Sequence, residues 1–576
     1  MTSLVELRVL EGPNLYFPRA TIKLTVDVSA LAAVSTQTAV RFARRIGLPN
    51  ARPGAPESGF RQRFAARAVV RLVRAIAHES GTARLAVRVR PTSDPHQIVV
   101  AFPWRHRGRA VALGRAVASV LDALPEADVE QAVSEGAAAT AAADAGPGPT
   151  TVTPRIPVIA VTGTNGKTTT SRMIAHIART QGRLVGWSNT DGIYIDGELV
   201  EAGDYSGPSG AGRILAHPQV QLAVTETARG GILLKGIGLT RNDVSVVTNV
   251  TADHLGLQGI DTVDQLAEVK GVVPRITRRS GWAVLNADDP RVFAMRSTIK
   301  AQVWVFSRDP DSPALREILS TGGGRATTVI DGWIAVLRSD SDAEPLVELV
   351  DVPMTLAGLS RFNVENTLAA ASAALAIGVP PDVVAAGLCT FRPDAEHNPG
   401  RMNFFSLPTG TGEDLSVVMD LAHNEAGLEA MIEIMNGVRR SGARLLLGLG
   451  AVGDRTDELI DKLGEIGARD SDVVAIAHKQ GYLRGRSLEE MDGLLRGGAE
   501  RVGVTDIESY RTEVECLAAL VAQARPGDVV GLMCHAEREE CYAWLAEHGG
   551  TPDSPETLGA KVRAAAGQPA GGAAGT

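Results

Sequence analysis

The chain has 576 residues, of which 44% are hydrophobic and 22% are charged, with a formal net charge of −8. At roughly 100–200 residues per domain, this length predicts about three or four domains and excludes a single core. Apolar runs stay far below the roughly 20 residues that cross a bilayer, and the N-terminal "MTSLVELRVLEGPN" has no basic stretch before an apolar one, so we expect a cytoplasmic protein without a secretory signal.

The four cysteines show no metal-type CxxC spacing, which favours buried, reduced thiols. They are Cys389, Cys516, Cys534 and Cys541.

Residues 1–130 are predicted to form a small α+β domain. Strand-like alternation occurs at 21–28, 83–90 and 96–104, and helical periodicity at 59–78 and 108–124. This region carries 19 Lys+Arg against 10 Asp+Glu, whereas the remainder carries 39 against 56. A basic module of this kind either attracts an anionic partner or has a solvated, arginine-rich surface.

Domain boundaries follow from changes in composition. Residues 131–152 are rich in Ala, Gly and Pro without a sustained apolar face, which indicates a linker. From 153 to 393, apolar strands alternate with helices, which predicts a central domain with a mainly parallel sheet. The alternation resumes at 394–550 as a smaller, Rossmann-like α/β domain, and residues 551–576 are expected to be a flexible tail.

The stretch "VIAVTGTNGKTTTSRMIAHI", residues 158–177, combines a buried strand, a glycine-containing turn, Lys-Thr and a helix. Gly163 and Gly166 stand closer together than in the common phosphate-binding loop, which has four residues between its glycines. Backbone N–H groups at a helix N-terminus favour anions. The pattern therefore predicts a nucleotide site in which Lys167 meets the terminal phosphates and Thr168 ligates magnesium.

Two further strand ends are predicted to face the same crevice. Glu226 ends the strand in "LAVTETARGGIL", and Asn249 ends the strand in "VVTNVTADHLG", with Asp253 and His254 just beyond. Ligands of open parallel sheets bind at the carboxyl ends of the strands. These positions would bring a carboxylate and an imidazole close to the Thr168 hydroxyl.

Taken together, these motifs resemble the Mur ligase superfamily, which includes folylpolyglutamate synthase and uses this shortened loop. The stretches that carry the resemblance are "GTNGKTTT", "TETARGGIL", "TNVTADHLG", "LNADDP", "GRMN" and "DLAHNEAG". Within the superfamily they are most similar to the Mur-like half of cyanophycin synthetases, and "LRVLEGPNLYFPRATIKLTVDV" is similar to the N-terminal domain of those enzymes. The resemblance covers roughly residues 1–125 and 155–550.

One departure from the cyanophycin synthetases limits what the resemblance implies. Those enzymes carry an ATP-grasp module between the two similar regions, whereas here about 30 residues separate them. The implied activity is therefore a single one, an ATP-dependent amide ligation in which a substrate carboxylate is activated as an acyl phosphate and attacked by an amino acid amine. The alternatives are a folylpolyglutamate synthase-like ligase and a nucleotide-binding subunit with little chemistry of its own, serving a separate ATP-grasp ligase.

The resemblance also implies roles for individual residues, with ATP and two magnesium ions as cofactors. The implied metal ligands are Thr168, Glu226, His254 and Lys270. Lys270 would bind as a carbamate, because it stands 16 residues after His254, a spacing similar to that in many Mur ligases. The implied catalytic residues are Lys167, Glu226, His254, Lys270, Arg401 and Asp420. The implied ATP contacts are Gly163, Thr164, Asn165, Gly166, Lys167, Thr168, Thr169, Asn286, Asn366, Arg401, Asp420, His423 and Asn424.

Several of these assignments have a structural alternative. Asn363 and Asn366, in a helix where Phe362 replaces the family's histidine, either reach adenine or cap the helix. Asn286 and Asp288 follow a strand where the family contacts nucleotide. Residues 453–455 (Gly-Asp-Arg) are candidates for binding the incoming amine or its carboxylate.

The expected partners are a peptide-like or small carboxylate acceptor, an amino acid and further copies of the chain, with no nucleic acid and no membrane.

Overall fold

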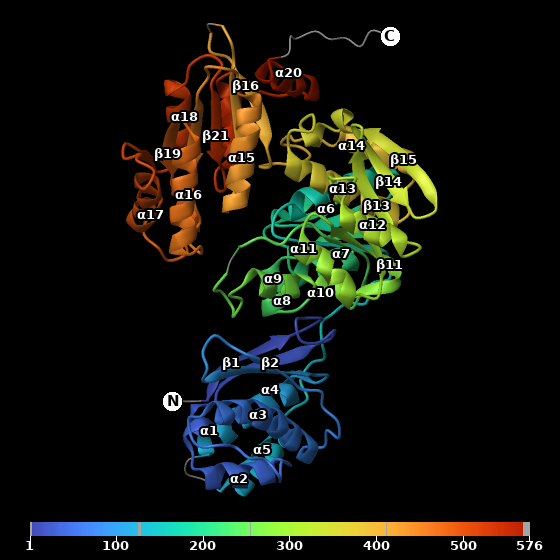
Figure 1. Cartoon of the computed structure of the whole chain (residues 1–576), viewed down its shortest axis with the longest axis vertical. Coiled ribbons are helices and arrows are strands. Elements are labelled where there is room, and N and C mark those ends of the chain that lie inside the picture. Colours follow the sequence, from blue (N-terminus) through green and yellow to red (C-terminus); the bar gives the residue numbers. More distant parts are fainter. Residues whose placement is uncertain (1–2, 125–127, 254, 411, 568–576) are drawn as a thin grey trace.

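The computed structural model describes residues 3–124, 128–253, 255–410 and 412–567, and three α/β bodies follow one another along the molecule (Figure 1). The predicted fold class is confirmed: a small α+β domain, a central domain built on a mainly parallel sheet, and a C-terminal α/β domain. In the described residues, none of the helices combines the length and apolar character that a bilayer crossing requires.

The N-terminal domain is an antiparallel sheet covered by helices. Its strands, in the order β1-β2-β4-β3, are β1 (Leu4–Leu10), β2 (Thr21–Asp27), β3 (Arg88–Pro91) and β4 (Gln97–Pro103). Its helices are α1 (Ser29–Ala33), α2 (Thr36–Arg45), α3 (Gly59–Glu79), α4 (Arg107–Ala123) and α5 (Val129–Ala142). Ile22, Leu24 and Val26 alternate along β2 and are fully buried in the core that these helices complete.

The expected linker at 131–152 is wrong over its first half, because residues 131–142 belong to α5. Asp128 caps this helix by accepting a hydrogen bond from the Glu130 N–H at 2.9 Å. Val133 and Ala137 are buried in the domain core. Alanine has the highest helix propensity, and its small side chain lets α5 pack closely on its neighbours, so an Ala-rich composition indicated a helix rather than a linker.

The central domain contains one long sheet in the order β15-β14-β13-β12-β11-β10-β5-β9-β6-β7-β8. Neighbours from β13 to β6 are parallel, whereas hairpin strands at both ends are antiparallel and were not predicted. The strands are β5 (Val158–Thr162), β6 (Val185–Ser188), β7 (Gly192–Ile195), β8 (Glu198–Ala202), β9 (Leu222–Glu226), β10 (Asn242–Val247), β11 (Thr277–Asn286), β12 (Gln302–Phe306), β13 (Arg325–Ile330), β14 (Trp333–Arg338) and β15 (Ser341–Glu348).

Helices cover the two faces of this sheet and form two separate apolar cores. One core contains α6 (Lys167–Thr180), α13 (Arg361–Ala376) and α14 (Pro381–Thr390). The other contains α7 (Pro208–Ala216), α8 (Arg229–Leu234), α9 (Val263–Lys270), α10 (Val272–Arg275), α11 (Pro290–Ala294) and α12 (Pro313–Ser320). Burial on both faces explains why β5 and β9 are apolar runs without alternation.

The C-terminal domain has the strand order β20-β19-β18-β21-β17-β16-β22. Its strands are β16 (Asn403–Leu407), β17 (Leu415–Asp420), β18 (Leu445–Leu449), β19 (Val473–Ala477), β20 (Glu508–Tyr510), β21 (Val529–Met533) and β22 (Thr551–Pro552). Its helices are α15 (Glu425–Val438), α16 (Asp457–Asp470), α17 (Leu488–Glu500), α18 (Glu513–Gln523), α19 (Arg538–Glu547) and α20 (Pro555–Ala565).

The expected flexible tail at 551–576 is therefore corrected over 551–567. β22 pairs with β16, and α20 buries Leu558 in the core of the C-terminal domain. Residues 568–576 lie outside the described residues. Three of the four cysteines are buried, as expected, while Cys389 is half-buried, and all four are free thiols.

Candidate functional site

The glycine-containing loop stands at the carboxyl end of β5, directly before α6. Gly166 caps α6 in the left-handed conformation (φ 84°). A Cβ added at Gly166 would lie 2.1 Å from Asn366 Oδ1, and one at Gly163 would lie 1.9 Å from Thr248 Oγ1. Both glycines are therefore required by close approach, which leaves the backbone N–H groups at the start of α6 accessible to an anion.

The segment after β10 holds this loop in place. Thr248 donates a hydrogen bond through Oγ1 to the Asn165 carbonyl at 2.6 Å. Asn249 accepts one from the Asn165 N–H at 2.9 Å and donates one back to the Asn165 carbonyl at 3.2 Å. Thr248 was not singled out from the sequence, although its position directly after a buried strand was the available signal.

Thr168 and Glu226 form the centre of the site. Thr168 Oγ1 donates to Glu226 Oε2 at 2.9 Å, which brings the start of α6 onto the end of β9. The second carboxylate oxygen, Oε1, is buried and has no hydrogen-bond partner among the described residues. Burial raises the pKa of Glu226, and the nearby Lys167 opposes that shift. A buried hydroxyl beside a carboxylate with one unused oxygen suits a divalent cation.

Lys270 lies directly behind the loop, at the end of α9. Its side chain is buried, and Nζ donates to the Gly163 carbonyl at 2.6 Å. Burial, reinforced by the charge of Lys167, places the pKa of Lys270 well below its usual value. The amine is therefore biased toward its neutral, nucleophilic form. His254, predicted to accompany Lys270, lies outside the described residues.

The C-terminal domain contributes the opposite wall. Arg401 Nη2 lies 3.5 Å from Thr168 Oγ1. Asp420, the last residue of β17, accepts a hydrogen bond from the Met402 N–H at 2.8 Å, and burial raises its pKa to about 6 although Arg401 is near. Burial also lowers the pKa of His423 to about 4, so this imidazole is neutral at pH 7.

Asn165 and Asn424 join the two domains through a reciprocal pair of amides. Asn424 Nδ2 donates to Asn165 Oδ1 at 3.0 Å, and Asn165 Nδ2 lies 3.4 Å from Asn424 Oδ1. Asn424 also caps α15, where its Oδ1 accepts the Gly427 N–H at 2.9 Å. The cap fixes this side chain, so the loop and the first turn of α15 keep a defined separation.

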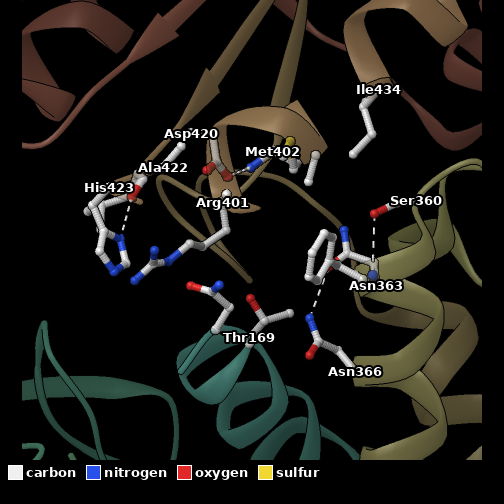
Figure 2. A pocket seen from close by; sticks show the side chains of 16 residues that line it. Thr169, Ser360, Asn363, Asn366, Arg401, Met402, Asp420, Ala422, His423 and Ile434 are labelled. Carbon is white, nitrogen blue, oxygen red and sulfur yellow. Dashed lines mark hydrogen bonds between the residues drawn. The ribbon is translucent and has the colours of Figure 1, made fainter. Parts of the chain in front are cut away.

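A cavity of about 90 Å³ lies between these walls. Figure 2 shows Thr169, Asn363 and Asn366 on the central-domain side, and Asp420, Ala422 and His423 opposite them. Phe362, which replaces the family's histidine, also lines the cavity, together with Ile434. The volume is smaller than the roughly 300 Å³ of a small-molecule site, so a nucleotide would need the domains to separate before it enters.

Two groups of predicted residues have other contacts. Asn286 lies outside this cavity, and its Nδ2 donates to the Thr248 carbonyl at 2.8 Å and to Glu365 Oε2 at 3.2 Å. It thus supports the segment that holds the loop. Arg455 pairs with Asp454 at 2.9 Å and lies 4.0 Å from Asp253 of the central domain.

An ion cluster beside the site was not predicted. Arg172, almost fully buried on α6, donates to Asp191 Oδ2 at 2.7 Å and to Asn398 Oδ1 at 3.3 Å. Arg538, the first residue of α19, approaches Asp191 Oδ1 at 3.3 Å. Asp191 therefore pairs with one arginine from each domain, and Arg172 also contacts the segment that carries Arg401, through Asn398.

Two family models match the chain. Residues 161–374 match the Mur ligase middle domain, and residues 400–534 match the Mur ligase glutamate ligase domain. Together these two matches span more than half of the chain.

Among curated proteins, cyanophycin synthetase of Crocosphaera subtropica is 42% identical over 63% of this chain and 40% of its own length. Cyanophycin synthetase of Synechocystis sp. is 43% identical over 60% of this chain and 38% of its own length. The UDP-N-acetylmuramoyl-L-alanyl-D-glutamate–2,6-diaminopimelate ligase of Gloeobacter violaceus is 30% identical over 56% of this chain and 61% of its own length. The chain thus spans about two fifths of the length of the cyanophycin synthetases it matches. With both Mur ligase domains in order, and the loop, strand-end carboxylate and buried lysine in one site, the chain belongs to the Mur ligase superfamily.

Proposed function

We propose that the chain is an ATP- and magnesium-dependent amide ligase that activates a carboxylate as an acyl phosphate and joins it to an amino acid amine. The relatives' names, which denote ligases and synthetases, support this proposal, as do the glycine-containing loop and the strand-end carboxylate of the site. We further propose that the acceptor is a peptide-like or small acid and that the reaction takes place in the cytoplasm.

One observation carries this proposal: Glu226 Oε1 is buried beside the Thr168 hydroxyl, at the start of α6, and none of the described residues hydrogen-bonds to it. A buried carboxylate oxygen without a partner costs free energy unless a cation or a donor completes it. Thr168 and Glu226 would hold magnesium, which supplies charge neutralisation on the transferred phosphoryl group. The hydrogen bond between Thr168 and Glu226, which leaves Glu226 Oε1 available, therefore supports these two residues as magnesium ligands.

The remaining loop residues would bind the phosphates. Backbone N–H groups of 163–168 and the Lys167 ammonium would contact the phosphate oxygens, and Arg401 would add a second cation from the other domain. The Lys167 ammonium donates a hydrogen bond to the Thr164 carbonyl at 2.8 Å, so it already lies beside the glycine-containing loop. Phosphoryl transfer depends on such positioning and charge stabilisation more than on covalent help from the protein.

The base would lie in the cavity between Phe362 and the first turn of α15. Phe362 offers a flat apolar surface, and Asn363 and Asn366 offer amides at its edge. Asp420, His423 and Asn424 would close this pocket from the C-terminal domain. Because the cavity is narrow here, binding would couple nucleotide entry to domain motion.

Lys270 would act as a carbamate. Its buried, neutral-biased amine is the form that reacts with carbon dioxide. Nζ would form a bond to the carbon of carbon dioxide and release one proton to water, which leaves an anionic N-carboxylate facing the site. The carbamate, with His254, would hold a second magnesium ion. The residues at 453–455 would then bind the incoming amine or its carboxylate from the C-terminal domain.

The test is phosphate release with ATP and magnesium, across a panel of amino acids with short acidic peptides as acceptors. A ligase releases phosphate only when a matching acceptor and amine are both present. Lys167→Ala should abolish that release, while Arg469→Ala, an exposed position on α16, should leave it unchanged.

Two other results would each redirect the proposal. If no substrate pair stimulates release but the chain binds nucleotide and a separate ATP-grasp ligase, the chain is a partner subunit. Stimulation by a folate-type acid alone would identify a folylpolyglutamate synthase-like ligase. Sedimentation of the same preparation would test the expected homo-oligomer.

A further inference from the structure

A basic cavity lies within the N-terminal domain and takes no part in the site described above. It measures about 520 Å³ and is formed by the turn after α3, the end of β4 and the start of α4. Its apolar floor includes Phe102, Trp104 and Leu113, all buried. All of its lining residues belong to the N-terminal domain, which lies at the opposite end of the molecule from the C-terminal domain (Figure 1).

Among the described residues, the ionisable side chains that line this cavity are all basic. They are Arg19, Arg84, Arg105 and Arg109, with His106 beside them. These four arginines are exposed, and no ion pair joins any of them to another described residue. Of these four side chains, only that of Arg109 hydrogen-bonds to another described residue, from Nε to the Ala143 carbonyl at 3.5 Å.

Acidic residues nearby in sequence are engaged elsewhere. Glu79, at the end of α3, receives two hydrogen bonds from Arg45, at 2.6 and 2.9 Å. Asp144, which follows α5, accepts the Gly146 N–H at 2.6 Å. None of the described residues that line the cavity is acidic, although the same domain provides a carboxylate for Arg45.

Four guanidinium groups around one concavity repel one another unless an anion neutralises them. Apolar walls concentrate the resulting positive potential inside the cavity, and each guanidinium can bind a carboxylate or phosphate through two parallel hydrogen bonds. On an ordinary solvated surface the arginines would lie apart from one another. Arg41 and Arg71 are exposed arginines of the same domain that lie outside the cavity.

We propose that this cavity is a binding site for a ligand that carries two or more oxyanion groups, carboxylates or phosphates. It is separate from the nucleotide loop and independent of the proposed ligase reaction. Carboxylates and phosphates both offer oxyanion groups to arginine, so the experiment compares a ligand of each kind.

The test is calorimetric titration of the full chain with hexa-aspartate and with tripolyphosphate, at about 50 mM salt. We expect the double variant Arg84→Gln/Arg105→Gln to weaken binding about tenfold or more. The matched double variant Arg41→Gln/Arg71→Gln removes the same charge from the same domain and should change binding less than about twofold. Arg84→Lys/Arg105→Lys should give an intermediate loss, because lysine keeps the charge but not the bidentate geometry.

Each outcome decides the proposal. Equal losses in both double variants, or no binding of either ligand, would overturn it in favour of a diffuse basic surface. Binding that disappears in Lys167→Ala would place the anion on the nucleotide loop and also overturn it, whatever becomes of the ligase activity. The stronger of the two ligands identifies the source. If the double variants do not fold, Arg105→Gln against Arg41→Gln makes the same comparison.

Discussion

Asp420 shows how burial turns a single residue into a pH-dependent feature. Its folded-state pKa of about 6 lies above the ordinary 3.8, so the folded chain binds its proton more tightly than the unfolded chain does. Its contribution to the free energy of unfolding is therefore fully present below pH 3.8 and is lost as pH rises through about 6. At about 1.4 kcal/mol per pKa unit, the span is on the order of 3 kcal/mol.

The variant Asp420→Asn removes this dependence. We expect the difference in unfolding free energy between wild type and variant to change by about 2–3 kcal/mol between pH 4 and pH 7, with the variant gaining relative stability at the higher pH. Denaturant unfolding without nucleotide, at several pH values, measures it. A difference that does not vary with pH would contradict the raised pKa.

Gly166 and Gly182, at the two ends of α6, separate backbone strain from crowding. Their φ angles are 84° and 82°. A Cβ at Gly182 would have no atom of the described residues within 4 Å, whereas one at Gly166 would contact Asn366. Gly182→Ala should cost only the left-handed strain, about 1–2 kcal/mol. Gly166→Ala should cost clearly more and distort the loop. Chemical unfolding of both variants, with ADP binding as a second readout, checks this, and equal losses would contradict the close approach.

At the scale of elements, Arg172 of α6 and Arg538 of α19 both pair with Asp191, so charge as well as apolar packing holds the central and C-terminal domains together. Arg172 is buried, and burial lowers its pKa, while Asp191 opposes that shift. Removing Asp191 leaves a buried guanidinium without a counter-charge. Removing Arg538 leaves the Arg172–Asp191 pair intact. It removes one ion pair between the domains, with Asp191, together with contacts to the Pro399 carbonyl and to Glu539.

We therefore expect Asp191→Asn to cost about 3 kcal/mol of unfolding free energy, and Arg538→Met about 1 kcal/mol or less. Arg538→Met should act mainly on domain closure, which small-angle scattering detects as a larger radius of gyration without nucleotide. Arg469→Met serves as the control, since Arg469 pairs with the adjacent Asp470 within α16. Asp191→Asn with the stability of wild type would show that Arg172 is neutralised by another group.

The predicted elements and the observed ones agree where local signals are strong. The apolar runs of β5, β9, β17, β18 and β21 were predicted because parallel strands are buried on both faces. The antiparallel strands β7, β8 and β15, which lie at or next to the two edges of the sheet, were not predicted, because they are partly exposed and lack that run. For α5 the high helix propensity of alanine favoured a helix, but a helix of this length is stable only where neighbouring elements cover it, and the sequence does not show that cover.

At the scale of the whole molecule, the N-terminal domain is joined to the central domain by backbone hydrogen bonds. The Glu11 N–H donates to the Lys235 carbonyl and the Ile237 N–H to the Pro13 carbonyl, each at 2.7 Å. Gly12 lies between these bonds, and a Cβ there would be 1.9 Å from the Ile237 carbonyl oxygen. The two domains can approach this closely only because residue 12 has no side chain.

Gly12→Ala should therefore loosen this junction without unfolding either domain. We expect faster proteolysis of the segment at 143–156 and a separate unfolding transition for the N-terminal domain. Gly59→Ala, at an open position with nothing within 4 Å, should behave as wild type. Unchanged proteolysis of Gly12→Ala would mean that the junction does not depend on this contact.

The sequence by itself determined the parts whose physics is local. The loop before α6, the strand-end Glu226 and the order of the domains follow from periodicity, glycine placement and capping over short stretches, and the motif set led to the superfamily. Only the tertiary structure decided which distant groups meet: Thr248 under the loop, Asp191 between two arginines, and four arginines around one cavity. Burial and uncompensated charge depend on segments far apart in the chain, and no short window of sequence contains both partners.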